Sequence, residues 1–192
     1  MLKIILLRHF ATVGNLQKKY IGITDEPLCK EGISTLKKVT YPRVKAVFVS
    51  PLTRCIQTAK LIYPDIIPTI CEDFKECDFG EFENKNYKEL SNNASYQRWI
   101  DSNGTIPFPM GENPENFKKR CIQEFLKVVE ISHKAGYQTI ALVIHGGTIM
   151  SILDRFSYPN KDYYHWQTKN GMGYITEFDE KEGRMVNICY IH

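Results

Sequence analysis

Several short apolar runs along the chain have the length and composition of strands that are buried in a sheet. These predicted strands cover residues 2–8, 45–49, 66–71 and 139–144. Closer to the C-terminus, two further apolar segments, 174–178 and 185–191, flank Glu182 and Gly183 and predict a β-hairpin. Together these segments supply the strands of the expected sheet.

Helical signals lie between the predicted strands. Phe117, Cys121, Phe125 and Val128 fall on one helical face, and Gly136 is typical of the position just after a helix. Helices are predicted over residues 30–40, from 51 to about 63, over about 85–101, over the segment that ends before 136, and from 146 to about 156. The acid-rich segment 74–83 is predicted to be a loop. The Gly- and Pro-rich segment 102–114 is predicted to be a longer loop and a candidate lid.

The second predicted helix has its own start signal. Ser50 is suited to the N-cap position and Pro51 to the first turn, because proline lacks the N–H that a first turn leaves unpaired. This placement puts Arg54 in the first turn of the helix.

The alternation of strands and helices predicts an α/β fold. We expect a three-layer αβα sandwich, with a mostly parallel central sheet and helices on both faces. No internal repeat, low-complexity segment or change in composition divides the chain. Its 192 residues are therefore expected to form a single domain, residues 1–192.

Charge and composition narrow the class of partner. The formal net charge is +3, with 25 basic residues spread among 22 acidic ones, which argues against nucleic acid as a partner. The basic cluster 118–120 is interpreted as a solvated helix face. The apolar run at the N-terminus is too short to span a membrane, and no cleavage-like site follows it. We expect a cytoplasmic protein with no membrane partner.

The six cysteines contain no CxxC pair, which argues against a zinc knuckle or a thioredoxin-like motif. An ordinary apolar content and no secretion signal favour reduced, mostly buried thiols over a disulfide framework. No spacing typical of metal ligands is present, so neither a metal nor a cofactor is expected.

Two histidines stand at the ends of two predicted buried strands. Arg8 and His9 follow the first strand, and His145 follows the strand over 139–144. Ligands of open α/β sheets bind beyond the carboxyl ends of the strands, so both imidazoles are expected in one pocket. Imidazole beside arginine indicates chemistry on an anion, and phosphate is the best candidate.

Five sequence blocks together resemble the histidine phosphatase superfamily, also called the phosphoglycerate mutase-like family. Each block is weak evidence alone, but all five occur in the family's order. They are Arg8-His9 with Thr12 and Asn15, the segment 50–59 with Arg54, the acidic segment 76–83, Gly111-Glu112-Asn113, and Ile144-His145-Gly146-Gly147.

The resemblance implies a phosphoryl-transfer site. His9 is implied as the nucleophile, because a neutral imidazole can form a covalent phosphohistidine. Arg8 and Arg54 are implied as fixed donors to the phosphoryl oxygens, and His145, protonated when phosphate is bound, as a third positive contact.

Weaker phosphate contacts are implied for three further positions. Asn15 can add a neutral hydrogen bond, and Thr12 is a weaker candidate for the same task. Backbone N–H groups at Gly146, where the last predicted helix begins, can also face the anion.

The leaving oxygen needs a proton, which a carboxylic acid with a raised pKa can donate before it acts as a base toward water. Alignment of the acidic block with the family places this acid at Glu76. Glu81 and Glu83 are the alternatives.

Three functions remain open at this point. The first is a phosphomonoesterase for a small-molecule phosphate ester, working as a monomer or homodimer. The second is a phosphoglycerate mutase, which the compact region before His145 disfavours, since Arg98 is its only basic residue between Lys88 and Lys118. The third is a non-catalytic phosphate-binding domain, which would not need an acid at Glu76.

Among phosphatases, the chain most resembles α-ribazole phosphatases of cobalamin assembly, through the segment 20–28, its small size and the His-Gly-Gly block. The substrate suggested by this resemblance is α-ribazole 5′-phosphate. Phe10 replaces the glycine usual after the first histidine, and its ring is expected to narrow the pocket or stack on a ring of the substrate.

Overall fold

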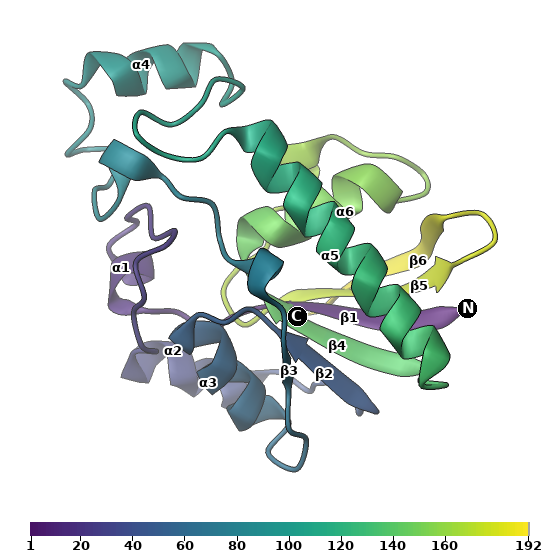
Figure 1. The fold of residues 1–192 in the computed structure, drawn as a ribbon. Helices are drawn as coiled ribbons and strands as arrows, with labels where there is room; N and C mark the ends of the chain where they lie inside the picture. The colour runs from purple at the N-terminus through teal and green to yellow at the C-terminus, as the bar shows by residue number, and fades with distance from the viewer. Residues whose placement is uncertain (192) are drawn as a thin grey trace.

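A six-stranded mixed sheet forms the centre of the computed structural model, which describes residues 1–191 (Figure 1). The strand order is β3-β2-β4-β1-β5-β6. The four strands from β3 to β1 are parallel, and the C-terminal hairpin β5–β6 joins the edge of β1 in antiparallel fashion. The strands are β1 (Leu2–Arg8), β2 (Ala46–Val49), β3 (Thr69–Ile70), β4 (Thr139–Ile144), β5 (Gly173–Asp179) and β6 (Arg184–Ile191).

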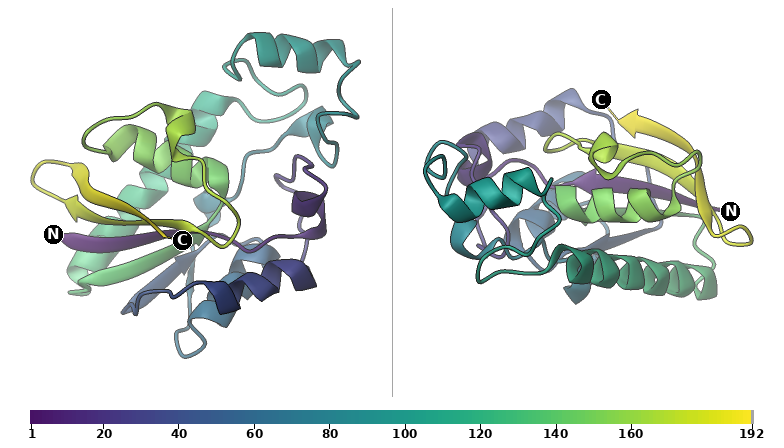
Figure 2. Two further views of the ribbon diagram at one scale, coloured as in Figure 1. Left: turned by 180° about the vertical axis from the view of Figure 1, so that it is seen from behind. Right: turned by 90° about the horizontal axis from the view of Figure 1, so that it is seen from above.

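Helices cover both faces of this sheet, as Figure 2 shows from two further sides. The α-helices are α1 (Val13–Leu16), α2 (Lys30–Ser34), α3 (Thr53–Ile62), α4 (Ala94–Asp101), α5 (Pro114–Lys134) and α6 (Gly146–Phe156). Short 3₁₀ helices are η1 (Thr35–Lys38), η2 (Glu72–Phe74), η3 (Gly80–Phe82) and η4 (Tyr163–Trp166).

Alternate residues of the central strands pack into two separate cores. Ile4 and Leu142 point into a core shared with α5 and α6, whereas Ile5 and Val143 point into a core shared with α3. This is the period-two alternation of a strand that is covered on both sides. The predicted α/β fold with three layers and a mostly parallel sheet is confirmed.

The helix α4 lies beyond the end of the sheet (Figure 1), and a third core forms next to it. It is formed by side chains from α4, from the loops before and after it and from the start of α5, and includes Phe82, Tyr96, Phe108 and Phe117. Aromatic rings dominate this cluster and pack mostly edge to face.

Several predicted boundaries are wrong for local reasons. The strand predicted over 66–71 is reduced to Thr69–Ile70, because Pro68 has no N–H to donate to a ladder. The helix predicted over 30–40 ends at Ser34 and continues only as the 3₁₀ helix η1. The helix predicted over 85–101 begins at Ala94, because Asn93 caps it by accepting a hydrogen bond from the Tyr96 N–H at 2.9 Å.

The predicted cap of the second helix is also wrong. The helix α3 begins at Thr53, its N-cap is Leu52, and no side chain caps it. Ser50 instead turns toward the end of β4, where its hydroxyl lies 2.7 Å from Nε2 of His145. Three other predictions are confirmed. They are the C-terminal hairpin, the helix that starts at Gly146 and the helix that ends just before Gly136.

The interpretation of 118–120 as a solvated face is wrong for Arg120, whose guanidinium is engaged by backbone carbonyls and by Glu112. Lys119, its neighbour on the helix, is exposed. The cysteines are free, and all but Cys189 are buried. Within residues 1–191, no helix has the length and apolar character to cross a membrane.

Candidate active site

The register of the sheet brings the two predicted histidines together. Arg8 pairs with Ile144 across β1 and β4, so His9 and His145 are the next residues on neighbouring parallel strands. The His9 N–H donates to the Ile144 carbonyl at 3.0 Å, and the two imidazole ring centroids lie 5.2 Å apart. Ser50 follows β2 on the other side of β4, and its N–H donates to the Val143 carbonyl.

His9 is held in a single tautomer. Its Nδ1 lies 2.6 Å from the carbonyl oxygen of Phe10, which can only accept, so Nδ1 carries the proton and Nε2 keeps its lone pair. The ring is buried, and burial together with the positive charges of Arg54 and Arg8 lowers the pKa of His9 well below its usual value. The imidazole is therefore neutral at physiological pH, with a free lone pair on Nε2.

His145 is the N-cap residue of α6 and is fully buried. Its Nε2 meets the Ser50 hydroxyl at 2.7 Å and lies 3.5 Å from Sγ of Cys55. Burial, followed by the positive charge of Arg54, lowers its pKa well below the usual value. An anion beside both rings would oppose these effects and favour protonation of His145.

Arg54 is fully buried, although it lies in the first turn of α3. Its Nη1 donates to the Thr24 carbonyl at 2.8 Å and its Nη2 to the Gly22 carbonyl at 2.7 Å. These bonds fix the guanidinium plane against the loop after α1. The Nε of Arg54 is buried and has no hydrogen-bond partner.

Arg8 shows the same pattern. Its Nη1 donates to the Thr168 carbonyl at 2.7 Å, while its buried Nε has no partner. Across residues 1–191, neither Arg8 nor Arg54 belongs to any of the ion pairs in the structure. Two cations that belong to no ion pair and have unused donors, next to two neutral imidazoles, can bind an anion.

Glu76 enters this site from the segment that follows η2. Its Oε1 accepts from the Cys77 N–H at 3.0 Å and its Oε2 from the Gly147 N–H at 3.3 Å. Burial raises the pKa of the carboxyl above its usual value, although both N–H groups and both arginines act in the opposite direction. The result favours the protonated acid.

Gly147 is required where α6 approaches this carboxyl. A Cβ atom at this position would lie 2.5 Å from Oε1 of Glu76 and 3.0 Å from the ring of Phe117. The neighbouring Gly146 lies against Arg8, since its Cβ would stand 3.5 Å from Cζ of that guanidinium. The start of α6 is thus packed directly against the charged groups of the site.

The two weaker candidates form a helix cap. The Thr12 hydroxyl accepts from the Asn15 N–H at 3.3 Å, and Oδ1 of Asn15 accepts from the Thr12 N–H at 3.2 Å, which is a reciprocal capping box at the start of α1. Oδ1 of Asn15 also accepts from the Asn170 side chain. The roles of Thr12 and Asn15 in phosphate binding stay predictions.

The alternative acids lie elsewhere. Glu83 is committed to structure, because its carboxylate accepts from the N–H groups of Gly22, Ile23 and Phe79. Glu81 is exposed at η3. Of the three carboxylates, Glu76 is the one whose side chain contacts the start of α6.

A cavity of about 450 Å³ opens beside Glu76 and Gly147. Four aromatic side chains of its lining form a closed circuit of contacts, with centroid separations of 5.1 to 6.1 Å. We call them the aromatic wall: Tyr20, Phe79, Trp99 and Phe108. Phe117, Tyr163 and Tyr164 contribute further rings. Of the described residues, Lys118 is the one cation in the lining, and it lies over the Tyr163 ring and within 3.6 Å of the Asp154 carboxylate.

The expectation for Phe10 is wrong. Its ring is fully buried, packs against Tyr41 and Gly171, and is not part of the cavity lining. Of the two tryptophans, Trp99 lines the cavity and Trp166 belongs to the core.

Two features of the site were missed by sequence reasoning. One is Ser50 as the partner of His145. The other is most of the aromatic wall, whose members are spread along the chain from Tyr20 to Phe108. No spacing within a single segment could have found a set of rings that come from separate loops.

Within residues 1–191, no group of three histidine, cysteine, aspartate or glutamate side chains is placed to hold a metal ion. The positive charge in the site comes from Arg8 and Arg54. The arrangement can therefore bind an anion, present a neutral imidazole lone pair to it, and supply a proton from Glu76.

Comparison with known proteins agrees with this geometry. The profile of the family described as "Histidine phosphatase superfamily (branch 1)" matches residues 4–190. The chain is 27% identical over 193 aligned positions to the adenosylcobalamin/α-ribazole phosphatase of Escherichia coli, covering 92% of this chain and 90% of that protein. It is 27% identical to a 2,3-bisphosphoglycerate-dependent phosphoglycerate mutase of Gloeobacter violaceus, covering 78% and 73%.

The fold also matches solved structures. The crystal structure of the α-ribazole phosphatase from Shigella flexneri superposes with a TM-score of 0.82, covering 94% of this chain and 92% of that one. At 22% identity, this likeness shows a shared fold and nothing about the substrate.

Proposed function

Because this chain belongs to the histidine phosphatase superfamily, whose members include phosphatases and mutases that act through phosphohistidine, we propose that it is a phosphomonoesterase with His9 as its nucleophile. The observation that carries the proposal is the fixed tautomer of His9 beside two arginines, Arg8 and Arg54, whose buried Nε groups have no hydrogen-bond partner. This combination gives a neutral nucleophile and a binding site for the phosphoryl oxygens in the same place.

In the first step, Nε2 of His9 attacks phosphorus, and the P–O bond to the leaving group breaks. Arg8, Arg54 and His145 hold the non-bridging oxygens, where charge is neutralised as the phosphoryl group moves. Backbone N–H groups at Gly146 add to this contact at the start of α6. The product of this step is phospho-His9 and a free leaving group.

Glu76 supplies the proton to the leaving oxygen in that step. Burial keeps its carboxyl protonated to a higher pH than usual because it raises the pKa, which suits a general acid. As a carboxylate it then takes a proton from the attacking water, which displaces Nε2 of His9 and releases inorganic phosphate. The free imidazole and the protonated acid are restored at the end of the cycle.

A phosphomonoesterase is favoured over a mutase by the lining of the cavity. A mutase must hold a second phosphate or a carboxylate next to the transferred group, which requires cations there. Within the described part of the chain the lining offers only Lys118, and that ammonium is already paired with Asp154. A non-catalytic binding domain is disfavoured because simple anion binding does not require a buried acid beside the arginines.

The substrate that we propose is α-ribazole 5′-phosphate, whose leaving group is a nucleoside with a planar aromatic base. The cavity supports this choice, because its size is within the usual range for small-molecule sites, about 300–1,000 Å³, and its lining contains the aromatic wall. The relative from E. coli carries this activity in its name. The corresponding place in metabolism is cobalamin biosynthesis.

We further propose the setting in which the enzyme works. Residues 1–192 act as one domain, in the cytoplasm, as a monomer or homodimer, on a small-molecule phosphate ester and without a nucleic-acid or membrane partner or a cofactor. The single sheet that all three cores pack against or adjoin supports the one-domain description. Light scattering on the purified chain distinguishes the monomer from the homodimer.

Phosphate release without added metal tests the proposal, with α-ribazole 5′-phosphate, 3-phosphoglycerate and an aryl phosphate compared side by side. We expect the wild type to release phosphate from α-ribazole 5′-phosphate much faster than from the other two compounds, and His9→Ala to release almost none. Comparable slow release from all three compounds would remove the cobalamin assignment and leave a phosphatase for another ester. Transfer of phosphate to a second hydroxyl of 3-phosphoglycerate, without net release, would favour the mutase.

A further inference from the structure

Arg120, on the second turn of α5, uses every one of its five N–H donors. Nε donates to Oε1 of Glu112 at 2.7 Å, and Nη2 donates to Oε2 of the same carboxylate at 2.8 Å. The remaining donors reach three backbone carbonyls, those of Asp73 and Lys75 at 2.7 Å and that of Glu76 at 3.1 Å. The guanidinium thus binds the main chain that carries the proposed acid.

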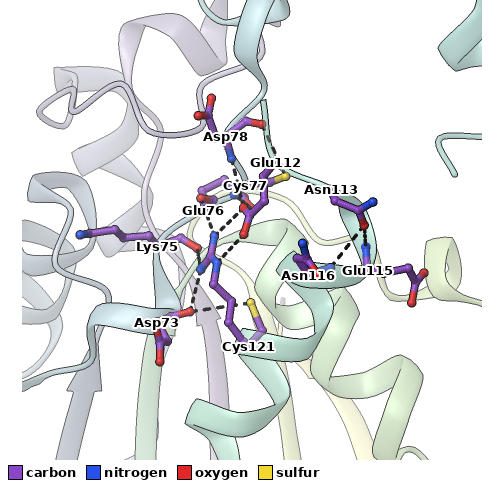
Figure 3. A network of polar contacts seen from close by, with 11 residues as sticks. Asp73, Lys75, Glu76, Cys77, Asp78, Glu112, Asn113, Glu115, Asn116 and Cys121 are labelled. Atoms are coloured by element: carbon purple, nitrogen blue, oxygen red, sulfur yellow. Dashed lines mark hydrogen bonds and ion pairs between the residues drawn. The ribbon is translucent and has the colours of Figure 1, made fainter. Parts of the chain in front are cut away.

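Glu112 holds the same segment from its other side. Its N–H donates to the Asp78 carbonyl at 2.9 Å, and its Oε2 accepts from the Asp78 N–H at 3.4 Å. Figure 3 shows Glu112 beside Glu76 and Asp78. Backbone groups at Lys75, Glu76 and Asp78 are therefore held by one bidentate ion pair between Glu112 and Arg120. We call this pair and its backbone contacts the clamp.

The Glu76 carboxyl depends on this support. Its own side-chain bonds in the structure are the two N–H contacts from Cys77 and Gly147, and the second is long at 3.3 Å. The segment 75–79 contains no helix or strand, so no ladder fixes the backbone there. The position of the Glu76 carboxyl therefore depends on the contacts of the clamp with the main chain around Glu76.

A second contact links Arg120 to the site. Cζ of its guanidinium lies 4.9 Å from the centroid of the Phe117 ring, and this ring lies against Gly147, whose N–H binds Glu76. The Arg120 side chain is only 23% exposed and that of Glu112 only 19%, so water does not substitute easily for either partner. A solvated helix charge would make none of these contacts.

We infer that Arg120 and Glu112 are positioning residues that hold Glu76 at the distance from His9 required for proton transfer to the leaving oxygen. The inference rests on the proposed function, in which Glu76 is the acid. Lysine cannot replace the arginine, because one ammonium cannot reach acceptors that a planar fork spans on two sides. The clamp acts through the acid alone, so its effect must disappear when the acid is absent.

A double-mutant cycle tests this dependence. The rate at which His9 becomes phosphorylated is measured by rapid quench with an alkyl phosphate, for the wild type, Arg120→Lys, Glu76→Gln and the double variant. General acid catalysis is worth about 10²–10⁴-fold, so Arg120→Lys should slow the step about tenfold with Glu76 present and less than about twofold in the Glu76→Gln background. Equal losses in both backgrounds overturn the inference.

The leaving group gives a second readout. A nitrophenyl ester needs little protonation as it leaves, so Arg120→Lys should slow its transfer to His9 much less than that of the alkyl ester. A purely structural defect would slow both esters equally, and that result also overturns the inference. Lys119→Ala is the matched control, since this exposed residue on the same helix makes none of the clamp contacts.

The remaining arms separate the possible failures. If Arg120→Lys does not fold by circular dichroism, Glu112→Gln, which keeps the shape of the side chain, takes its place in the same cycle. If the wild type forms no phosphohistidine at all, the proposed function fails together with the inference. If phosphohistidine forms but Arg120→Lys slows the step equally with and without Glu76, the proposed phosphatase function is unaffected and only the positioning role of the clamp is overturned.

Discussion

The candidate site has two regions that are built in different ways. One is the group of residues around His9 and His145, which we call the phosphoryl end, and the other is the cavity beside it. His9, Ser50 and His145 each follow a strand directly. The N–H groups of His9 and Ser50 donate to carbonyls of β4, the strand that leads to His145, so all three positions are fixed by the sheet. The aromatic wall has no such frame, because its rings come from loops and from α4 and are held mainly by contact with each other. In the proposed function, the first region carries out phosphoryl transfer and the second selects the leaving group, so we expect changes in the aromatic wall to alter specificity more than the chemical step.

The largest expected effect lies at the phosphoryl end. His9→Ala should reduce turnover of every phosphate ester by at least about 10⁴-fold, since removal of a covalent nucleophile removes the whole reaction path. The melting temperature should stay close to that of the wild type. Phosphate release and acid-quench trapping of the phosphoenzyme measure the effect. Appreciable turnover by this variant would show that another group is the nucleophile.

Glu76→Gln should produce the next largest effect, and it should depend on the leaving group. Alkyl esters should lose about 10²–10⁴-fold in the rate of the first step, and aryl esters much less. The acid must be protonated, so this rate in the wild type should fall as pH rises through the raised pKa of Glu76. That fall should be missing in the variant. Equal slowing of both ester classes, or an unchanged pH profile, would count against this acid.

A smaller effect is expected from the cavity. Trp99→Ala should lower kcat/KM for an ester with an aromatic leaving group about tenfold, because one stacking contact with a large ring is lost. Glycerol phosphate, which has no ring, should be affected little, and phosphorylation of His9 by it should continue. Trp99→Phe keeps a ring and serves as the control. A uniform loss for both substrates would place Trp99 in the fold rather than in substrate recognition.

The smallest expected effect is on stability and again concerns the phosphoryl end. The pKa values of His9 and His145 are lower in the folded protein than in the unfolded chain. The unfolded state therefore binds protons first, and the free energy of unfolding should fall as pH drops below about 6.5, by at most about 1.4 kcal/mol per unit of pKa shift for each ring. Glu76 has the opposite effect on the free energy of unfolding. Its pKa is raised in the folded protein, so the folded state takes up this proton first and acidification adds to its stability.

Urea unfolding between pH 8 and pH 5 measures this dependence, and replacing both histidines by asparagine isolates it from the contribution of Glu76. The double variant should lose less stability on acidification than the wild type. An identical slope for the two proteins would mean that the imidazoles are not held neutral by the fold.

The sheet and the meeting of the two histidines could be predicted from the sequence because both follow local rules. A buried strand followed by Arg8-His9, and another followed by His145, places both histidines at the same edge of a parallel sheet. Hydrophobic spacing found α5 and the hairpin for the same reason. The bounds of short elements were less predictable, because single residues decide them. Pro68 shortens the strand β3, and Asn93 sets the start of the helix α4.

Other side chains were misjudged because their partners lie far away in the sequence. Ser50 has every local feature of a helix cap, yet it meets His145 across 95 positions. Arg120 sits in a basic cluster, yet it reaches the carbonyl of Asp73, 47 positions earlier. Phe10 directly follows His9, the proposed nucleophile, but its ring lies outside the cavity lining and packs against Tyr41.

The sequence by itself determined the fold class, the family and the pairing of His9 with His145 at one edge of the sheet, because these depend on periodicity and on residues within a few positions of a strand end. Only the tertiary structure decided the tautomer of His9, the unused donors of Arg8 and Arg54, the aromatic wall and the clamp on Glu76. Burial and hydrogen-bond geometry arise from contacts between distant segments, and a local pattern does not encode which distant group a side chain will meet.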